Sequence, residues 1–189
     1  MAEEQIRTMV DANGAIGFES ARDPEHQKRL WKGRKGAFGA MGRLAPDLYV
    51  QDAVVPRSEL PGVLEKVGQI CDDLGLRLAN VFHAGDGNLH PNIGYDGRDP
   101  DEVDRVVTAG RRIIDVCLEV GGALSGEHGI GLEKQEFMSL QFTEDDLLTM
   151  RRVREVWNPE GLLNPGKLLP TPRACAEVSP VATPPGSSA

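Results

Sequence analysis

The chain has 189 residues, of which 40% are hydrophobic and 26% are charged, and its net charge is -8. These values are typical of a globular protein with one domain, or one domain and a tail. The negative charge argues against nucleic acid and anionic membrane surfaces as partners, and no apolar run is long enough for a membrane span. Three widely separated cysteines and the lack of a signal sequence predict a cytoplasmic protein with reduced thiols.

Residues 1–47 are predicted to form an N-terminal helical segment. Apolar residues at helical spacing predict a first helix over residues 2–12. Asp23-Pro24 has the pattern of an N-cap with proline at the first helical position, which predicts a second helix through about Phe38. A short strand is predicted between them, at residues 16–19.

Residues 48–131 are predicted to alternate between strands and helices. The order strand, helix, strand, strand, helix, strand is the βαββαβ pattern of ferredoxin-like folds. We therefore predict an α+β fold with an antiparallel ferredoxin-like sheet, both helices on one face and the other face free. The predicted strands are 48–55, 76–83, 88–95 and 123–125, and the predicted helices are 58–74, capped by Ser58, and 100–120.

Residues 132–169 are predicted to form a C-terminal helical segment. A helix is predicted over 132–141, and Thr143 with Asp146 has the spacing of a capping box for a second helix. The proline-rich residues 170–189 are predicted to be a disordered tail.

Two histidines lie in a glycine-rich segment between two predicted strands. A hairpin centred between positions 86 and 87 would place His83 directly opposite His90, with Cβ atoms roughly 4.5–5.5 Å apart. Side chains alternate along a strand, so Asn92 would point to the same face as His90. A lone histidine is more often a structural residue than a ligand, but an opposed pair in such a hairpin favours a metal site. The site would lie on the face that the helices leave free.

A second glycine-bracketed segment, 126–129, follows the last predicted strand. Glu127 can supply a third ligand, although the residues alone leave that role open, and His128 would then be a base beside the metal. Asp86 is interpreted as a turn-former or as an acceptor for a ligand's hydrogen bond. Two imidazoles and a carboxylate suit zinc, iron or manganese, so the metal's identity stays open.

Together these segments resemble the C-terminal half of the FAD-linked oxidase family of the vanillyl-alcohol oxidase type. Within it the chain is most similar to the FAD-linked subunits of glycolate oxidase and to the D-lactate dehydrogenases. The matching segments are Leu30–Lys35, Pro46–Tyr49, Asp52–Pro56, His83–Pro91, Ser125–Gly131 and Leu162–Lys167.

The resemblance implies a role for each residue of the predicted metal site. His83, His90 and Glu127 would bind a divalent metal ion, with zinc as the expected ion. His128 would be the catalytic base that takes the proton of the substrate hydroxyl.

The resemblance also implies substrate- and cofactor-binding residues. Arg34, in a basic helix face, and Asn92 would bind the substrate, although Arg34 alone is interpreted as a surface arginine. Asn164 and Lys167, which otherwise form a turn, would contact FAD. A lysine found near the pocket in the hydroxyglutarate relatives is replaced by Val50, which weakens the case for a dicarboxylate substrate.

The implied function is the oxidation of a small D-2-hydroxy acid, such as glycolate or D-lactate, to the 2-oxo acid. The chain would be the substrate and metal domain of an FAD-dependent dehydrogenase, residues 132–169 would face the FAD-binding domain, and that domain is expected to be absent. The chain alone is therefore expected to be inactive. Its expected partners are an FAD-binding domain or subunit and an iron–sulfur electron-acceptor subunit, which could hold it at the inner membrane. The alternatives are a non-catalytic metal-binding module that docks an FAD-binding partner, and an inert truncated remnant.

Overall fold

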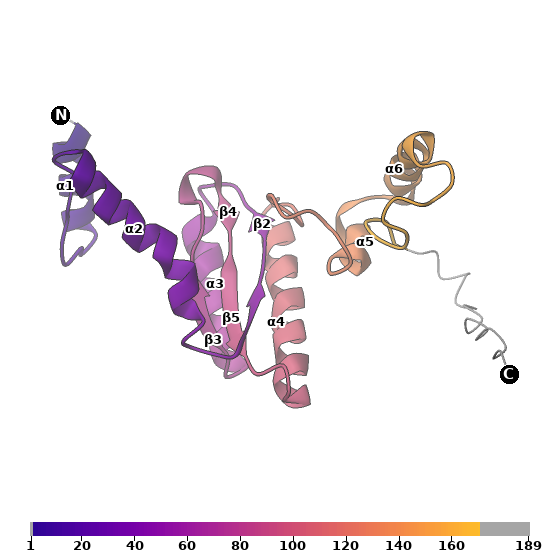
Figure 1. Cartoon of the computed structure of the whole chain (residues 1–189), viewed down its shortest axis with the longest axis horizontal. Coiled ribbons are helices and arrows are strands. Elements are labelled where there is room, and N and C mark those ends of the chain that lie inside the picture. The colour runs from indigo at the N-terminus through magenta and orange to yellow at the C-terminus, as the bar shows by residue number, and fades with distance from the viewer. Residues whose placement is uncertain (1, 171–189) are drawn as a thin grey trace, which may run out of the picture.

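The structure, a computed structural model, describes residues 2–170 and combines helices with two small antiparallel sheets in an α+β architecture (Figure 1). The α-helices are α1 (Ala2–Ala12), α2 (Pro24–Met41), α3 (Leu60–Asp73), α4 (Pro100–Glu119), α5 (Met138–Gln141) and α6 (Glu144–Trp157). The strands are β1 (Asp47–Val50), β2 (Ala53–Val54), β3 (Arg77–Asn80), β4 (Asn88–Leu89) and β5 (Pro91–Tyr95). Two 3₁₀ helices, η1 (Ala84–Asp86) and η2 (Gln135–Phe137), complete the elements.

The strands are shorter than predicted and belong to two sheets. β1, β5 and β3 form one antiparallel sheet in that order, and β2 pairs with β4 in the other. The predicted strand at 123–125 is reduced to a single bridge between Val54 and Ala123. The ladder is interrupted near Pro91 because proline has no N–H to donate, so Gln51 N donates to Pro91 O (3.0 Å) without a reciprocal bond.

The core lies between the strands and helices α3 and α4. α3 contacts α4 and β3, and α4 contacts β5 and β2. Both helices pack on the strand face that carries Leu89 and Ile93, which are fully buried. Burial of this apolar face is the main stabilising contribution. The opposite face carries Asp52, His90 and Asn92, and it positions the candidate site.

Helices α1 and α2 extend from one side of this core, and α5 and α6 from the opposite side (Figure 1). Asp23 caps α2 as predicted, because its side chain accepts a hydrogen bond from His26 N (2.8 Å). The predicted strand at 16–19 is wrong: Ile16 is fully exposed and the segment pairs with no described strand. Isolated strands are unstable without a pairing partner.

Two further predictions about helix ends need correction. Ser58 is not the cap of α3, which begins after Glu59 without a side-chain hydrogen bond at its cap. The predicted helix at 132–141 is present only as η2 and α5, because its first residues form turns. The capping box at Thr143 is present. The predicted disorder at 171–189 lies outside the described residues.

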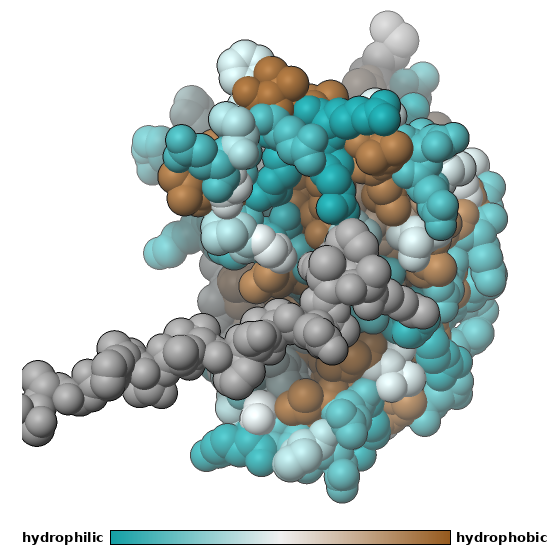
Figure 2. Space-filling view, turned by 90° about the vertical axis from the view of Figure 1, so that its right-hand side faces the viewer, coloured by the Kyte–Doolittle hydropathy of each residue, from teal (hydrophilic) through white to brown (hydrophobic). Residues whose placement is uncertain are grey.

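Within residues 2–170, no helix combines the length and the apolar character of a membrane span. Figure 2 shows the end of the molecule beyond α4, where apolar side chains lie open among hydrophilic ones. The exposed large apolar residues of α6 and the segment after it are Leu148, Val153, Val156, Trp157, Leu162, Leu163 and Leu168.

Candidate metal centre

The two histidines of the hairpin lie on the same face, but in a different register from the predicted one. His83 pairs with Asn88, through His83 N to Asn88 O (3.0 Å), and not with His90. The turn occupies residues 84–87 and ends at Gly87 in a left-handed conformation (φ 71°), so its centre lies one residue earlier than predicted. The register therefore differs by two residues, and a shift of two keeps every side chain on its face. The imidazole rings are diagonal neighbours, with centroids 5.5 Å apart at 86°.

Glu127 joins the two imidazoles. Its Oε1 lies 2.8 Å from His90 Nε2 and 3.5 Å from His83 Nε2. The three ligand atoms all lie within 4.8 Å of one another, which is the spacing a bound ion requires. His90 is buried, whereas the side chains of His83 and Glu127 are 47% and 50% exposed. One side of the cluster is therefore open to a substrate, as in catalytic metal sites.

The hydrogen bond on the other side of His90 defines which nitrogen can bind a cation. His90 Nδ1 lies 3.2 Å from the backbone oxygen of Gln51. A carbonyl can only accept, so Nδ1 carries a proton in this contact. Nε2 faces Glu127 Oε1 at 2.8 Å and is the nitrogen left to bind a cation, the arrangement found in histidine ligands. The donor set and its geometry thus fit a divalent metal ion.

The loop that carries Glu127 and His128 is held by a buried carboxylate. Asp52 is 0% exposed and accepts hydrogen bonds from Ser125 Oγ (2.6 Å) and from the backbone N–H of Gly126 (3.0 Å), Glu127 (3.1 Å) and His128 (3.0 Å). Burial alone would raise the pKa of Asp52, but these donors and the nearby Lys134 ammonium favour the charged form and lower the pKa to about 2. Asp52 is therefore ionised in the folded protein.

Lys134 is the buried counter-charge of Asp52. Its side chain is 3% exposed, its Nζ lies 3.4 Å from Asp52 Oδ2, and it also donates to the backbone oxygen of Asp52. Asp52 was recognised in the sequence only as part of a matching segment, and Lys134 was missed. The available signal was a carboxylate inside an apolar strand, because such a charge is buried only with partners.

His128 lies beside the three-residue cluster and not within it. Its ring stacks on that of His90, with centroids 4.9 Å apart and 10° between the planes. Asp52, His90 and His128 also bring ligand atoms within 4.8 Å. The cluster of His83, His90 and Glu127 is the better metal site because the oxygens of Asp52 are already bonded to N–H and O–H donors.

A pocket of about 330 Å³ opens next to His128. The residues that line it are Val50, His128, Gly129, Ile130, Gly131, Leu132, Glu133, Lys134 and Lys167. Its apolar lining residues are Val50, Ile130 and Leu132, and its charged ones are Glu133, Lys167 and Lys134, of which Lys134 is paired with Asp52. Its size suits a small molecule beside the histidine.

Of the remaining predicted site residues, only some lie at the histidine cluster or the pocket beside it. Asn92 is buried below His90 and donates from Nδ2 to His90 O (2.6 Å), while its Oδ1 has no hydrogen-bond partner among residues 2–170. Lys167 lines the pocket and donates to Asn164 Oδ1 (3.5 Å), but Asn164 is outside the pocket lining. Arg34 is exposed on α2, outside both the pocket and the histidine cluster.

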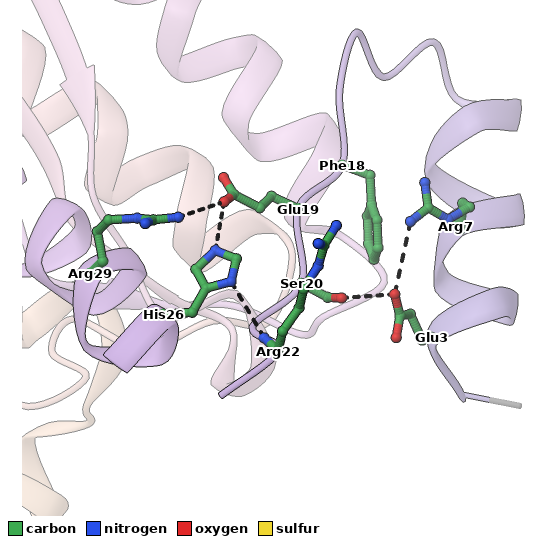
Figure 3. A pocket seen from close by; sticks show the side chains of 8 residues that line it. All are labelled: Glu3, Arg7, Phe18, Glu19, Ser20, Arg22, His26 and Arg29. Carbon is green, nitrogen blue, oxygen red and sulfur yellow. Dashed lines mark hydrogen bonds and ion pairs between the residues drawn. The ribbon is translucent and has the colours of Figure 1, made fainter. Parts of the chain in front are cut away.

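The fourth histidine belongs to a separate pocket of about 370 Å³ at the N-terminal end (Figure 3). His26 Nε2 lies 2.6 Å from Glu19 Oε1, and Arg29 lies 3.4 Å from the same oxygen. Arg7 and Glu3 form a further ion pair (3.8 Å). The carboxylates of this pocket are thus paired with its cations, and His26 ties the chain before α2 to the helix.

Comparison with known proteins adds independent information. The model of a family described as FAD linked oxidases, C-terminal domain, matches residues 1–168. Glycolate oxidase subunit GlcD of Escherichia coli (strain K12) is 47% identical over 174 residues, which cover 92% of this chain and 35% of that protein. Subunit GlcD of Bacillus subtilis (strain 168) is 32% identical over 87% of the chain and 35% of its own length. The mitochondrial D-lactate dehydrogenase [cytochrome] of Arabidopsis thaliana is 30% identical over 90% of the chain and 30% of its own length. The chain thus spans about a third of the length of these relatives.

Proposed function

Because the chain belongs to the family of FAD-linked oxidase C-terminal domains, we propose that it is the substrate and metal domain of an FAD-dependent D-2-hydroxy-acid dehydrogenase. The observation that carries this proposal is the cluster of His83, His90 and Glu127 beside the pocket at His128. The relatives are named for glycolate and D-lactate, and both compounds are 2-hydroxy acids. The proposed reaction converts the 2-hydroxy acid to the 2-oxo acid.

The proposed metal ligands are His83 Nε2, His90 Nε2 and the carboxylate of Glu127. Zinc is the proposed ion, although iron and manganese accept the same donors. A bound divalent cation would supply Lewis acidity, which lowers the pKa of a coordinated oxygen acid. His90 would bind the ion from the buried side of the site. His83 and Glu127 are half exposed, so the opposite side leaves room for the substrate.

His128 is the proposed base. Its ring is held parallel to that of His90 and faces the pocket, so it can accept the proton of a substrate hydroxyl bound there. Asn92 is proposed to contact the substrate by resemblance, although its side chain is buried and lies outside the pocket lining. Val50 in the pocket lining favours a small monocarboxylate. Arg34 is assigned to the substrate carboxylate by resemblance, whereas Lys167 is the cation in the pocket lining that is not paired with Asp52.

FAD would supply the two-electron acceptor and would be bound mainly by another part of the protein or by another chain. Asn164 and Lys167 are the proposed contacts of this domain with FAD. We propose that residues 48–131 form a ferredoxin-like unit whose fourth strand is reduced to the Val54–Ala123 bridge. An iron–sulfur acceptor subunit and attachment to the inner membrane through such partners belong to the same proposal.

Metal binding by the purified chain tests the site directly. Titration with Zn²⁺ and elemental analysis are expected to show one ion per chain, and His83→Ala is expected to weaken affinity at least tenfold because one of three ligands is lost. His26→Ala is the matched control, since that imidazole binds Glu19 in the N-terminal pocket. Equal affinity of the wild-type and His83→Ala proteins would remove the central assignment.

The catalytic role of His128 is tested in a complete assembly with an FAD-binding partner. His128→Ala is expected to abolish turnover of glycolate or D-lactate while zinc affinity stays within a factor of about three. Turnover close to wild type would show that His128 is not the base.

A second candidate function is a non-catalytic metal-binding module that docks a flavin protein, and the exposed apolar side chains of α6 favour it. The two candidates differ in one outcome: for the module, His128→Ala leaves the activity of the assembly unchanged. A chain that binds neither zinc nor an FAD-binding partner would be an inert remnant.

A further inference from the structure

We propose that Asp52 is a positioning residue that sets the directions of Glu127 and His128 through the backbone of their loop. The inference rests on the proposed function, because it concerns how that metal site is assembled. Asp52 itself touches neither metal nor substrate in this proposal.

The loop from Ser125 to Gly131 has no regular secondary structure of its own. Its backbone N–H groups at positions 126, 127 and 128 all donate to Asp52, between 3.0 and 3.2 Å. Three successive amides bound to one carboxylate leave little freedom at the two Cα atoms that carry Glu127 and His128. The directions of both functional side chains therefore depend on a residue more than 70 positions away in sequence.

Ser125 extends these hydrogen bonds between Asp52 and the loop as far as Gly129, the last residue of the glycine-bracketed segment. Its hydroxyl donates to Asp52 Oδ2 (2.6 Å) and accepts from Gly129 N (2.8 Å). The carboxylate, the hydroxyl and four backbone amides thus form one connected network. Lys134 balances the buried charge of Asp52, so the network carries no unpaired ion.

The position of Asp52 also explains why the loop meets the histidines. The bond from Gln51 N to Pro91 O places Asp52 across from His90 on the neighbouring strand, with Oδ1 4.0 Å from His90 Nδ1. The Gln51 carbonyl, one residue earlier, accepts from the same nitrogen. Two adjacent residues between β1 and β2 therefore hold His90 and the Glu127 loop in register with each other.

Asp52 is not itself a metal ligand in this proposal, although it lies in the second cluster with His90 and His128. Both of its oxygens accept hydrogen bonds, and the side chain is fully buried. A ligand role would require loss of several of these bonds. The side chain of Glu127 is half exposed, its Oε1 contacts His83 and His90, and it is the carboxylate available to a cation.

Amide hydrogen exchange of the metal-free chain tests the hydrogen bonds between the loop and Asp52 without using the metal site. Asp52→Asn keeps the shape of the side chain but replaces one acceptor oxygen by an N–H donor and removes the charge. The amides of Gly126, Glu127 and His128 are expected to exchange at least tenfold faster, while the core amides of α4 keep their protection. The control is Asp11→Asn, which makes the same change at an exposed acid of α1. Unchanged exchange at these amides would overturn the proposal.

Ser125→Ala provides the same test with a milder change, and it applies if Asp52→Asn fails to fold. It removes one donor to Asp52 and the acceptor of Gly129 N. Exchange at Gly129 is expected to accelerate more than exchange at Gly126. Equal protection of Gly129 in both proteins would contradict the network.

A double-mutant cycle in Zn²⁺ affinity separates positioning from general destabilisation. Asp52→Asn alone is expected to weaken Zn²⁺ binding about 10- to 100-fold, the usual effect of removing a residue that orients ligands. In a Glu127→Gln background the same change is expected to cost less than threefold, because Asp52 acts through Glu127. Additive losses would show a merely structural role. Wild-type protein that binds no Zn²⁺ would refute the proposed metal site, while the exchange measurements would still decide the role of Asp52.

Discussion

Gly87 ends the hairpin turn in a backbone conformation that residues with side chains rarely adopt. Its φ is 71°, and a Cβ atom there would lie 2.2 Å from the backbone oxygen of Val55. Gly85 in the same turn has open space at the equivalent position and no positive φ. The two glycines of one turn therefore have different requirements.

Gly87→Ala is expected to lower the free energy of unfolding by about 2 kcal/mol or more, through backbone strain and displacement of Val55. Gly85→Ala should stay within about 0.5 kcal/mol of wild type. Urea unfolding followed by circular dichroism measures both variants. Equal midpoints for the two variants would show that the turn does not need glycine at position 87.

The buried cysteines have a measurable chemical consequence. Burial raises the pKa of Cys71 to about 11 and that of Cys117 to about 12, and both side chains are 1% exposed. Because the thiolate is the reactive form, both thiols should be almost unreactive in the folded chain at pH 8. A Cys175→Ser variant is expected to react with a thiol reagent only after denaturant is added, and then to yield two thiols. Rapid reaction of either thiol in buffer would contradict its placement in the core.

At the residue scale, the sequence predicted the members of the cluster better than the residue that organises them. His83, His90 and Glu127 stand in glycine-rich segments whose composition indicates a site. Asp52 is a single carboxylate within the predicted strand 48–55, and its partners lie more than 70 positions away. The role of Asp52 depends on its contact with the loop from Ser125 to Gly131, and no local sequence pattern predicts that contact.

Among the elements, α6 has the clearest sequence signal for its start, a capping box at its N-terminus. Thr143 Oγ1 accepts from Asp146 N (3.2 Å), and Asp146 Oδ2 accepts from Thr143 N (3.0 Å). Thr149, near the middle of the helix, donates only to Asp145 O (2.8 Å). One helix therefore offers a capping threonine and a matched control.

Thr143→Ala is expected to destabilise α6 by about 1 kcal/mol, whereas Thr149→Ala should be neutral or slightly stabilising because alanine has the higher helix propensity. The hydrogen bonds from Thr143 lower the pKa of Asp146, so their contribution is present above the ordinary aspartate pKa of about 3.9 and is lost as pH falls through the lowered value. The difference between the two variants, measured by hydrogen exchange of α6 amides, should shrink in acid. A difference that does not change with pH would exclude the carboxylate from the cap.

Hairpin register shows the limit of prediction at the element scale. Strand parity was readable from the alternation of apolar residues, and it placed both histidines on the correct face. The turn was predicted one residue too late, because η1 and the left-handed Gly87 together close the hairpin earlier than a symmetric turn. Parity depends on local hydrophobicity, but the exact pairing depends on the turn geometry.

For the molecule as a whole, the exposed apolar residues of α6 and the following segment are the most conspicuous surface feature (Figure 2). Trp157 is 80% exposed, and Val156 and Leu162 are each 73% exposed. The proposed FAD-binding partner is the expected occupant of this surface. Contiguous exposed apolar groups mark interaction sites.

Trp157 is therefore expected to become buried when an FAD-binding partner binds. In a Trp31→Phe background, which removes the other tryptophan, the fluorescence of Trp157 should shift to shorter wavelength on addition of the partner. Val156→Glu should weaken this binding at least tenfold by placing a charge in the apolar contact, with Glu144→Gln at the far end of α6 as the control. An emission maximum that stays constant while the partner binds elsewhere would exclude this surface.

The sequence by itself determined the α+β class, the helix boundaries with clear caps, the family and the residues of the candidate metal cluster. Each of these follows from local periodicity, capping chemistry or a motif contained in a few consecutive residues. Only the tertiary structure decided the division of the strands into two sheets, the shifted hairpin register, and the burial of Asp52 and Lys134 beneath the loop of Glu127 and His128. The physical reason is that these features depend on contacts between segments far apart in the chain, where pairing and desolvation, and not local preference, determine the outcome.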